Sequence, residues 1–280
     1  MKNLLLILLL VCPIYTKAQD SIIFKVKYLP ETEYTTEEVG TSDILMDIKG
    51  DSATLAEIAR SGMHLPMHMK GENTSTSVTR TGKLLDSGLI PYENWYTNVR
   101  MKVEGMGIVK DQESPISKMR VYGKYDPAGD SEVDSITGMP SNTLTKEQLM
   151  PILKRLEQTL VFPDRPLGTG DSFRMEIPIE MPIAGMNPIT LKVIAVYTLK
   201  EIHDGLAKFD VVMTMEMKTE NEKFKMDASG KGTGTSDFDI NKGYLKNYYT
   251  DLDITLTMLI ENMTMTVKMT EVSKQWTTIK

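Results

Sequence analysis

The stretch that decides the fold class is AKFDVVMTMEMK, residues 207–218, in which apolar and polar residues alternate. One face carries apolar side chains: Ala207, Phe209, Val211, Met213, Met215 and Met217. The opposite face is polar except at Val212. A period of two is what a β-strand with one buried face requires. Asp204 and Gly205 mark a tight turn just before it, so the stretch forms a hairpin with residues 190–202.

The same alternation recurs towards both ends of the chain. Residues 237–272 read as three strands with turns at 241–243 and 261–262, and residues 22–28 read as one more half-buried strand. Strands that follow one another through short turns form an antiparallel meander. We therefore predict a mainly β protein, with a large curved antiparallel sheet that resembles half of a barrel.

Two segments have helical patterns, and both are expected to pack against this sheet. In the longer, residues 145–160, a capping box of Thr145 with Gln148 precedes a leucine-rich stripe at helical spacing. The shorter covers residues 51–61. The longer helix separates two β-rich parts, residues 19–140 and 165–280, and because no low-complexity linker joins them we predict a single domain over residues 19–280.

The first eighteen residues have the form of a secretory signal peptide, with Lys2, an apolar run and small residues before Gln19. Cleavage near Ala18 is favoured over a lipid anchor on Cys12, because Val11 is a poor residue before a lipidated cysteine. Removal of this peptide changes the net charge from −6 to −8. An acidic chain without a basic stripe is not expected to bind nucleic acid. No later segment is apolar enough to span a membrane, so the protein is predicted to be periplasmic or secreted.

Two short motifs carry a family resemblance. PLGTGDSF at 166–173 and GTGTSDFDINKGYL at 232–245 resemble segments of uncharacterised secreted envelope proteins of Bacteroides-type bacteria. At the level of architecture the pattern also resembles the half-barrels of bacterial lipoprotein carriers, which hold acyl chains between a curved sheet and helices. The resemblance implies an exported β-sheet protein and, by analogy alone, a lipid ligand.

Methionines recur on the predicted inner face, and the chain contains 21 of them. Because methionine adapts to irregular apolar shapes, we predict a non-enzymatic binding protein for a lipid-like or other hydrophobic ligand. The expected lining is Phe209, Met213, Met215, Leu256, Met258, Met263 and Met265. The alternative is a structural or assembly module of the cell envelope with a solid core and a protein partner. No cofactor or catalytic constellation is recognisable, although carboxylate pairs brought together by the fold remain open.

Residues 63–70, MHLPMHMK, raise the question of a metal site. On a strand His64 and His68 stand roughly 14 Å apart, too far to share an ion, and Pro66 disfavours a helix there. Met67 and Met69 are about 7 Å apart on the other face and give a second alternative, Cu(I) binding. Burial of these methionines in the apolar face is the favoured interpretation.

Overall fold

The computed structural model describes residues 21–60, 62–105, 107–126, 129–138, 160–181, 189–220, 224–260 and 263–280. The predicted signal peptide lies outside these residues. So does the predicted helix at 145–160, apart from Leu160, which is buried.

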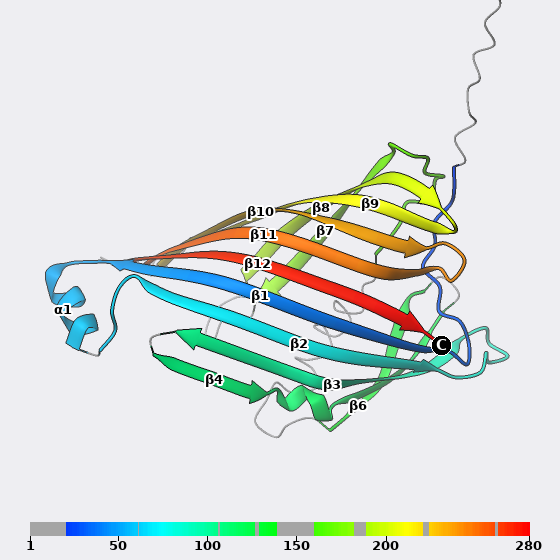
Figure 1. The fold of residues 1–280 in the computed structure, drawn as a ribbon, viewed down its shortest axis with the longest axis horizontal. Coiled ribbons are helices and arrows are strands. Elements are labelled where there is room, and N and C mark those ends of the chain that lie inside the picture. Colours follow the sequence, from blue (N-terminus) through cyan, green and yellow to red (C-terminus); the bar gives the residue numbers. More distant parts are fainter. Residues whose placement is uncertain are drawn as a thin grey trace, which may run out of the picture.

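The described residues form one antiparallel sheet, as the sequence predicts, and the mainly β fold class is confirmed (Figure 1). Its strands are β1 (Glu33–Lys49), β2 (Met67–Thr81), β3 (Ile90–Gly105), β4 (Ile108–Glu113), β5 (Arg120–Tyr125), β6 (Ser131–Thr137), β7 (Ser172–Met181), β8 (Ile189–His203), β9 (Leu206–Glu220), β10 (Phe224–Asp239), β11 (Tyr244–Ile260) and β12 (Met263–Ile279). The order across the sheet is β6-β5-β3-β2-β1-β12-β11-β10-β9-β8-β7, and β4 pairs with β3 beside this path.

The central pair of strands joins the two ends of the chain. β1 pairs with β12 on one side and with β2 on the other, so that Gly40 lies opposite both Ser273 and Asn73. Figure 1 shows the sheet curling, with β7 and β8 behind β12. We call the side that carries Tyr34, Phe209 and Phe238, each 1% exposed, the inner face, and the opposite side the outer face.

The core packs against the inner face in three clusters. The largest joins β7–β10 to the N-terminal stretch and to Leu160 and Leu167. A second, around Tyr92 and Val121, lies inside β3, β5 and β6. The third is small, centres on Met217 and Met226, and lies towards the opposite end of the strands. That end, which carries the β1–β2 connection, is called the distal end below.

The predicted helix at 51–61 is present as α1 (Ser52–Arg60). Asp51 caps it, because its Oδ1 accepts a hydrogen bond of 2.8 Å from the amide of Thr54. α1 has no buried residue and stands at the distal end between β1 and β2 (Figure 1), so it does not cover the inner face. A single 3-10 turn, η1 (Pro115–Lys118), precedes β5. Neither of these helical segments, within the described part of the chain, has the length and apolar character to cross a membrane.

Candidate functional site

The residues predicted to line a ligand cavity do not surround one in the described structure. Phe209 and Met213 are 1% and 5% exposed and belong to the largest core cluster, where aromatic rings fill the space around them. Leu256 and Met258 pack against the small distal cluster instead. Met215, Met263 and Met265 are partly exposed on the inner face. The set is therefore divided between solid packing and an open surface.

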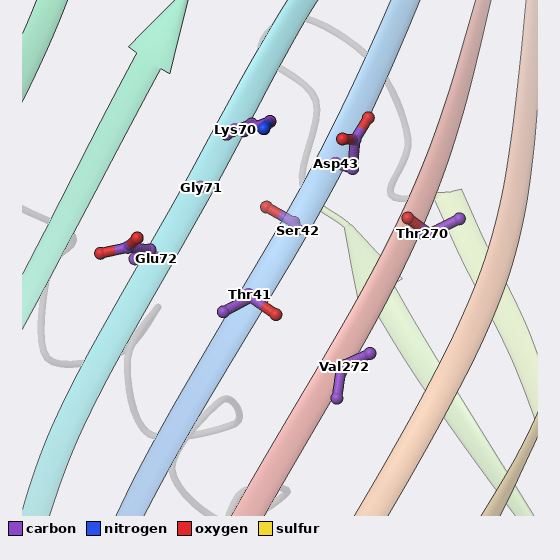
Figure 2. A pocket seen from close by; sticks show the side chains of 8 residues that line it. All are labelled: Thr41, Ser42, Asp43, Lys70, Gly71, Glu72, Thr270 and Val272. Carbon is purple, nitrogen blue, oxygen red and sulfur yellow. The ribbon is translucent and has the colours of Figure 1, made fainter.

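A pocket of about 300 Å³ lies elsewhere, across β2, β1 and β12 (Figure 2). Its lining residues are Thr41, Ser42, Asp43, Lys70, Gly71, Glu72, Thr270 and Val272. The strand register places six of these residues on the outer face, whereas Ser42 and Gly71 belong to the inner face. Its lining contains no methionine, and the predicted Met/Leu set does not enclose a cavity among the described residues, so the hypothesis of a hydrophobic ligand in a Met/Leu-lined concavity is wrong.

The segment around the two histidines divides between the faces of β2. The strand begins at Met67, so His64 precedes it, and the Nε2 of His68 lies 2.6 Å from Asp43 Oδ1 on the outer face. Met67, 7% exposed, and Met69 point to the inner face among apolar neighbours. Within the described ranges no three His, Cys, Asp or Glu side chains lie close enough to hold a metal ion. Cu(I) binding through Met67 and Met69 was an alternative within the same functional prediction, and it is contradicted together with that prediction.

The outer face carries charged side chains that are paired with one another. Its ion pairs include Glu33–Arg80, Asp43–His68, Asp111–Arg100, Glu176–Lys192, Asp210–Lys200 and Glu201–Lys208. Each exposed pair adds little to stability. Together they show that this face is hydrated, because a charge withdrawn from water without compensation is costly.

The middle of the inner face is polar, which the sequence interpretation missed. Three rows across β12, β1 and β2 carry small or polar residues in place of apolar ones. We call this set the polar belt: Glu38, Gly40, Ser42, Gly71, Asn73, Ser75, Glu271, Ser273 and Gln275. The two glycines leave space for their polar neighbours. A Cβ on Gly40 would collide with the side chain of Asn73, and a Cβ on Gly71 would collide with that of Ser42.

Two carboxylates in the polar belt lack a cationic partner among the described residues. At the paired positions of the eleven strands in the main path, Glu38 and Glu271 are the charged side chains that face inward. Outside the main path, Lys110 on β4 also faces inward. It lies four strands from Glu271, so the two residues are roughly 19 Å apart. Ser273 Oγ donates to Glu38 Oε1 at 3.4 Å. Burial, and then the charge of Glu38, raise the pKa of Glu271.

Beyond the belt, the distal part of the inner face is apolar and open. Its partly exposed side chains are Ile44, Met46, Ile48, Met69, Met265, Val267 and Met269. The inner face of β1 therefore changes from polar to apolar between Ser42 and Ile44, a step of about 7 Å. Alternate positions in residues 38–49, EVGTSDILMDIK, show this change, so the sequence could have predicted it by the reasoning applied to residues 207–218.

The raised pKa of Glu271 predicts a specific pH dependence. A carboxyl with a folded-state pKa above its unfolded value destabilises the fold once it is ionised, so its contribution is lost as pH rises through the folded-state pKa. Glu271→Gln should therefore raise the urea midpoint at pH 8 more than at pH 4. The matched control Asp253→Asn removes a carboxylate from the exposed outer face. Equal gains at both pH values for Glu271→Gln would contradict the assignment.

No protein-family model matches the chain, and no curated protein matches it. Among solved structures, the translocator domain of the autotransporter NalP from Neisseria meningitidis matches at 7% identity, covering 88% of each chain with a TM-score of 0.24. Pseudomonas aeruginosa OpdL matches at 6% identity, covering 88% and 99%, with a TM-score of 0.23. A mutant of the porin of Rh. blastica matches at 8% identity, covering 87% and 100%, with a TM-score of 0.24. Overlaps this low carry no argument about what the chain does.

These comparisons correct the expected family resemblance. The two motifs at 166–173 and 232–245 are not supported by any family model. No curated protein supports them either. The predicted resemblance to secreted envelope proteins and to lipoprotein-carrier half-barrels is wrong, since neither a family model nor a curated protein supports it, and the lipid ligand inferred from it has no remaining support.

Proposed function

We propose that the inner face binds an amphipathic, cationic polypeptide segment. In this proposal the chain is an exported, non-enzymatic binding protein, periplasmic or secreted, with an envelope protein as partner and no role in nucleic-acid binding. The observation that carries the proposal is the pair of inward carboxylates, Glu38 and Glu271, in a polar belt that supplies them with no counter-charge among the described residues.

The contrast between the two faces supports a cationic partner. Many outer-face carboxylates already have a lysine, arginine or histidine within 3.0 Å, as Glu176 has Lys192 at 2.8 Å. Glu38 and Glu271 repel each other in a half-buried setting. An ammonium or guanidinium group placed between them would relieve this repulsion. The attraction is stronger there than at a fully hydrated surface, because the effective dielectric constant is lower.

The apolar distal part supports a partner that is also partly hydrophobic. A bound segment with a cationic side chain over Ser273 would place apolar side chains over Met269 and Met46, two and three same-face positions further along the strands. Methionine surfaces accept varied apolar shapes with little specificity. The recognition is therefore predicted to depend on charge and amphipathic pattern more than on an exact sequence.

A labelled peptide of alternating lysine and leucine tests the proposal by fluorescence anisotropy. We expect micromolar binding that weakens as salt rises, since ions screen the charge attraction. The double variant Glu38→Gln, Glu271→Gln should weaken binding about tenfold or more, a loss of roughly 1.4 kcal/mol. Asp251→Asn, Asp253→Asn is the matched control, because it removes two carboxylates from the exposed outer face.

Two results would defeat the proposal. One is equal binding of the peptide by the wild type and by the inner-face double variant. The other is equal binding of a control peptide in which glutamate replaces every lysine, because such a peptide keeps the apolar pattern and reverses the charge.

A further inference from the structure

The sheet is open, and its two margins need something to hold them together. The outermost strands of the main path, β6 and β7, are not paired with each other in the part of the chain that the structure describes. A twisted sheet of this size curls by itself only to the extent that its strand geometry dictates. Contacts from outside the strand ladder therefore fix how far the margins approach.

Residues 22–31, called the strap below, cross the inner face at the end opposite α1. The sequence predicts a strand over 22–28, and the alternation is real, since Phe24 and Val26 are buried whereas Ile23 is 53% exposed. The strap does not join the ladder, however. Among the described residues its β-bridge is an isolated one, in which Ile22 and Leu167 exchange two hydrogen bonds of 2.9 and 3.0 Å.

The first half of the strap contacts the β7–β10 margin. Phe24, 3% exposed, has its ring 5.4 Å from that of Phe209 on β9 and 5.9 Å from that of Phe238 on β10. It also stacks on Phe162 at 5.1 Å, in the connection that leads to β7. Aromatic pairs of this kind add to the free energy of burial itself.

The second half contacts the β2–β5 margin. The ring of Tyr28 stacks on that of Tyr125 of β5, with centroids 3.5 Å apart and the planes 4° from parallel. The carbonyl of Leu29 accepts a hydrogen bond of 2.6 Å from Thr81 Oγ1 at the end of β2. Glu31 donates its amide to the carbonyl of Gly82 at 3.0 Å. Between the two halves, the amide of Lys27 donates to the Gly243 carbonyl at 2.8 Å, in the β10–β11 turn.

We propose that the strap is a separable clamp: it ties the two margins of the open sheet, and the slot that it fills will accept the same segment as a free peptide. The slot provides what an extended peptide needs, namely aromatic pockets for alternate side chains and backbone groups that pair with its amides and carbonyls. The strap thereby sets the curvature of the inner face. This inference stands whether or not a cationic partner binds there.

Hydrogen exchange on the full chain tests the clamp. Phe24→Ala should speed exchange of the Lys27 and Glu31 amides at least tenfold, although Glu31 bonds to the opposite margin. Ile23→Ala is the matched control and should leave both amides unchanged, because Ile23 is exposed. Faster exchange spread equally over all strands, or no change at Glu31, would overturn the proposal, because Phe24 would then be ordinary core.

A synthetic peptide of residues 21–31 tests the slot. Added to the Phe24→Ala variant, it should displace the weakened strap and bind at the inner face, so that the amide of Leu167, which donates to the carbonyl of Ile22, exchanges as slowly as in the wild type. The same peptide with Phe24→Ala should not do so. Failure of the intact peptide at a concentration of 1 mM (about 4 kcal/mol of binding free energy) would limit the strap to a fixed part of the core and overturn its separability.

Discussion

Replacing Phe209 by alanine is expected to lower the free energy of unfolding by about 3–5 kcal/mol. Phe209 is 1% exposed on β9, and its ring contacts the rings of Phe24, Phe162 and Phe173. Truncation would open a cavity among elements that cannot all move in to fill it, since they come from the strap, from the connection to β7 and from β7 itself. Urea denaturation followed by circular dichroism measures the change.

The neighbouring residue Val212 provides the control on the same strand. Val212 lies on the outer face and is 54% exposed, so Val212→Ala should change stability by less than about 0.5 kcal/mol. A loss below about 1.5 kcal/mol for Phe209→Ala would show that the surroundings close over the cavity, which would mean that the largest core cluster is looser than its packing indicates.

The alternation of residues 207–218 was sufficient to predict which face of β9 the side chains of residues 207–217 lie on. It works because a strand with one buried face repeats every two residues whatever its partners are. The same reasoning located the hairpin at Asp204 and Gly205, where both residues have positive φ. Short helix α1 was legible from its cap at Asp51, a purely local signal.

What the sequence could not show is which strands lie side by side. The pairing of β1 with β12 joins residues more than 200 positions apart, as Gly40 with Ser273. Glu38 and Glu271 are ordinary surface residues in any local window, and only that pairing makes them neighbours. The prediction of a strand over residues 22–28 was wrong for a related reason. Alternation shows that Phe24 and Val26 are buried, but not whether their backbone joins the hydrogen-bond ladder of the sheet.

The methionines illustrate a different limit. Their inward direction followed from the period of two, but the step from an apolar face to a ligand cavity did not, because flexible thioether side chains pack against aromatic rings as readily as they leave space. Met213 is 5% exposed and accepts a contact of 3.8 Å from the hydroxyl of Tyr248 at its sulfur. Whether a methionine face is solid or open is decided by the opposing side chains, which local sequence does not identify.

The second large effect is expected at Gly234 on β10. A Cβ built there would run into the carbonyl oxygen of Tyr249 on β11, and that oxygen belongs to backbone that cannot rotate away. Gly234→Ala must therefore move one strand relative to the other, and we expect a loss of about 2–3 kcal/mol. Urea denaturation with β10 and β11 followed by hydrogen exchange would measure the loss and locate it.

Gly82→Ala is the matched substitution, because a Cβ there meets its nearest neighbours in Pro91 at 3.7 Å, an ordinary contact. It should leave stability unchanged or raise it by up to about 1 kcal/mol, as alanine restricts the unfolded chain more than glycine does. Since the two variants add the same methyl group, a difference of about 2 kcal/mol or more between them isolates the close approach of β10 and β11. Equal effects would mean that β10 and β11 can separate more easily than their register indicates. The inner face at these two strands would then deform more easily than the inner face at β1 and β12.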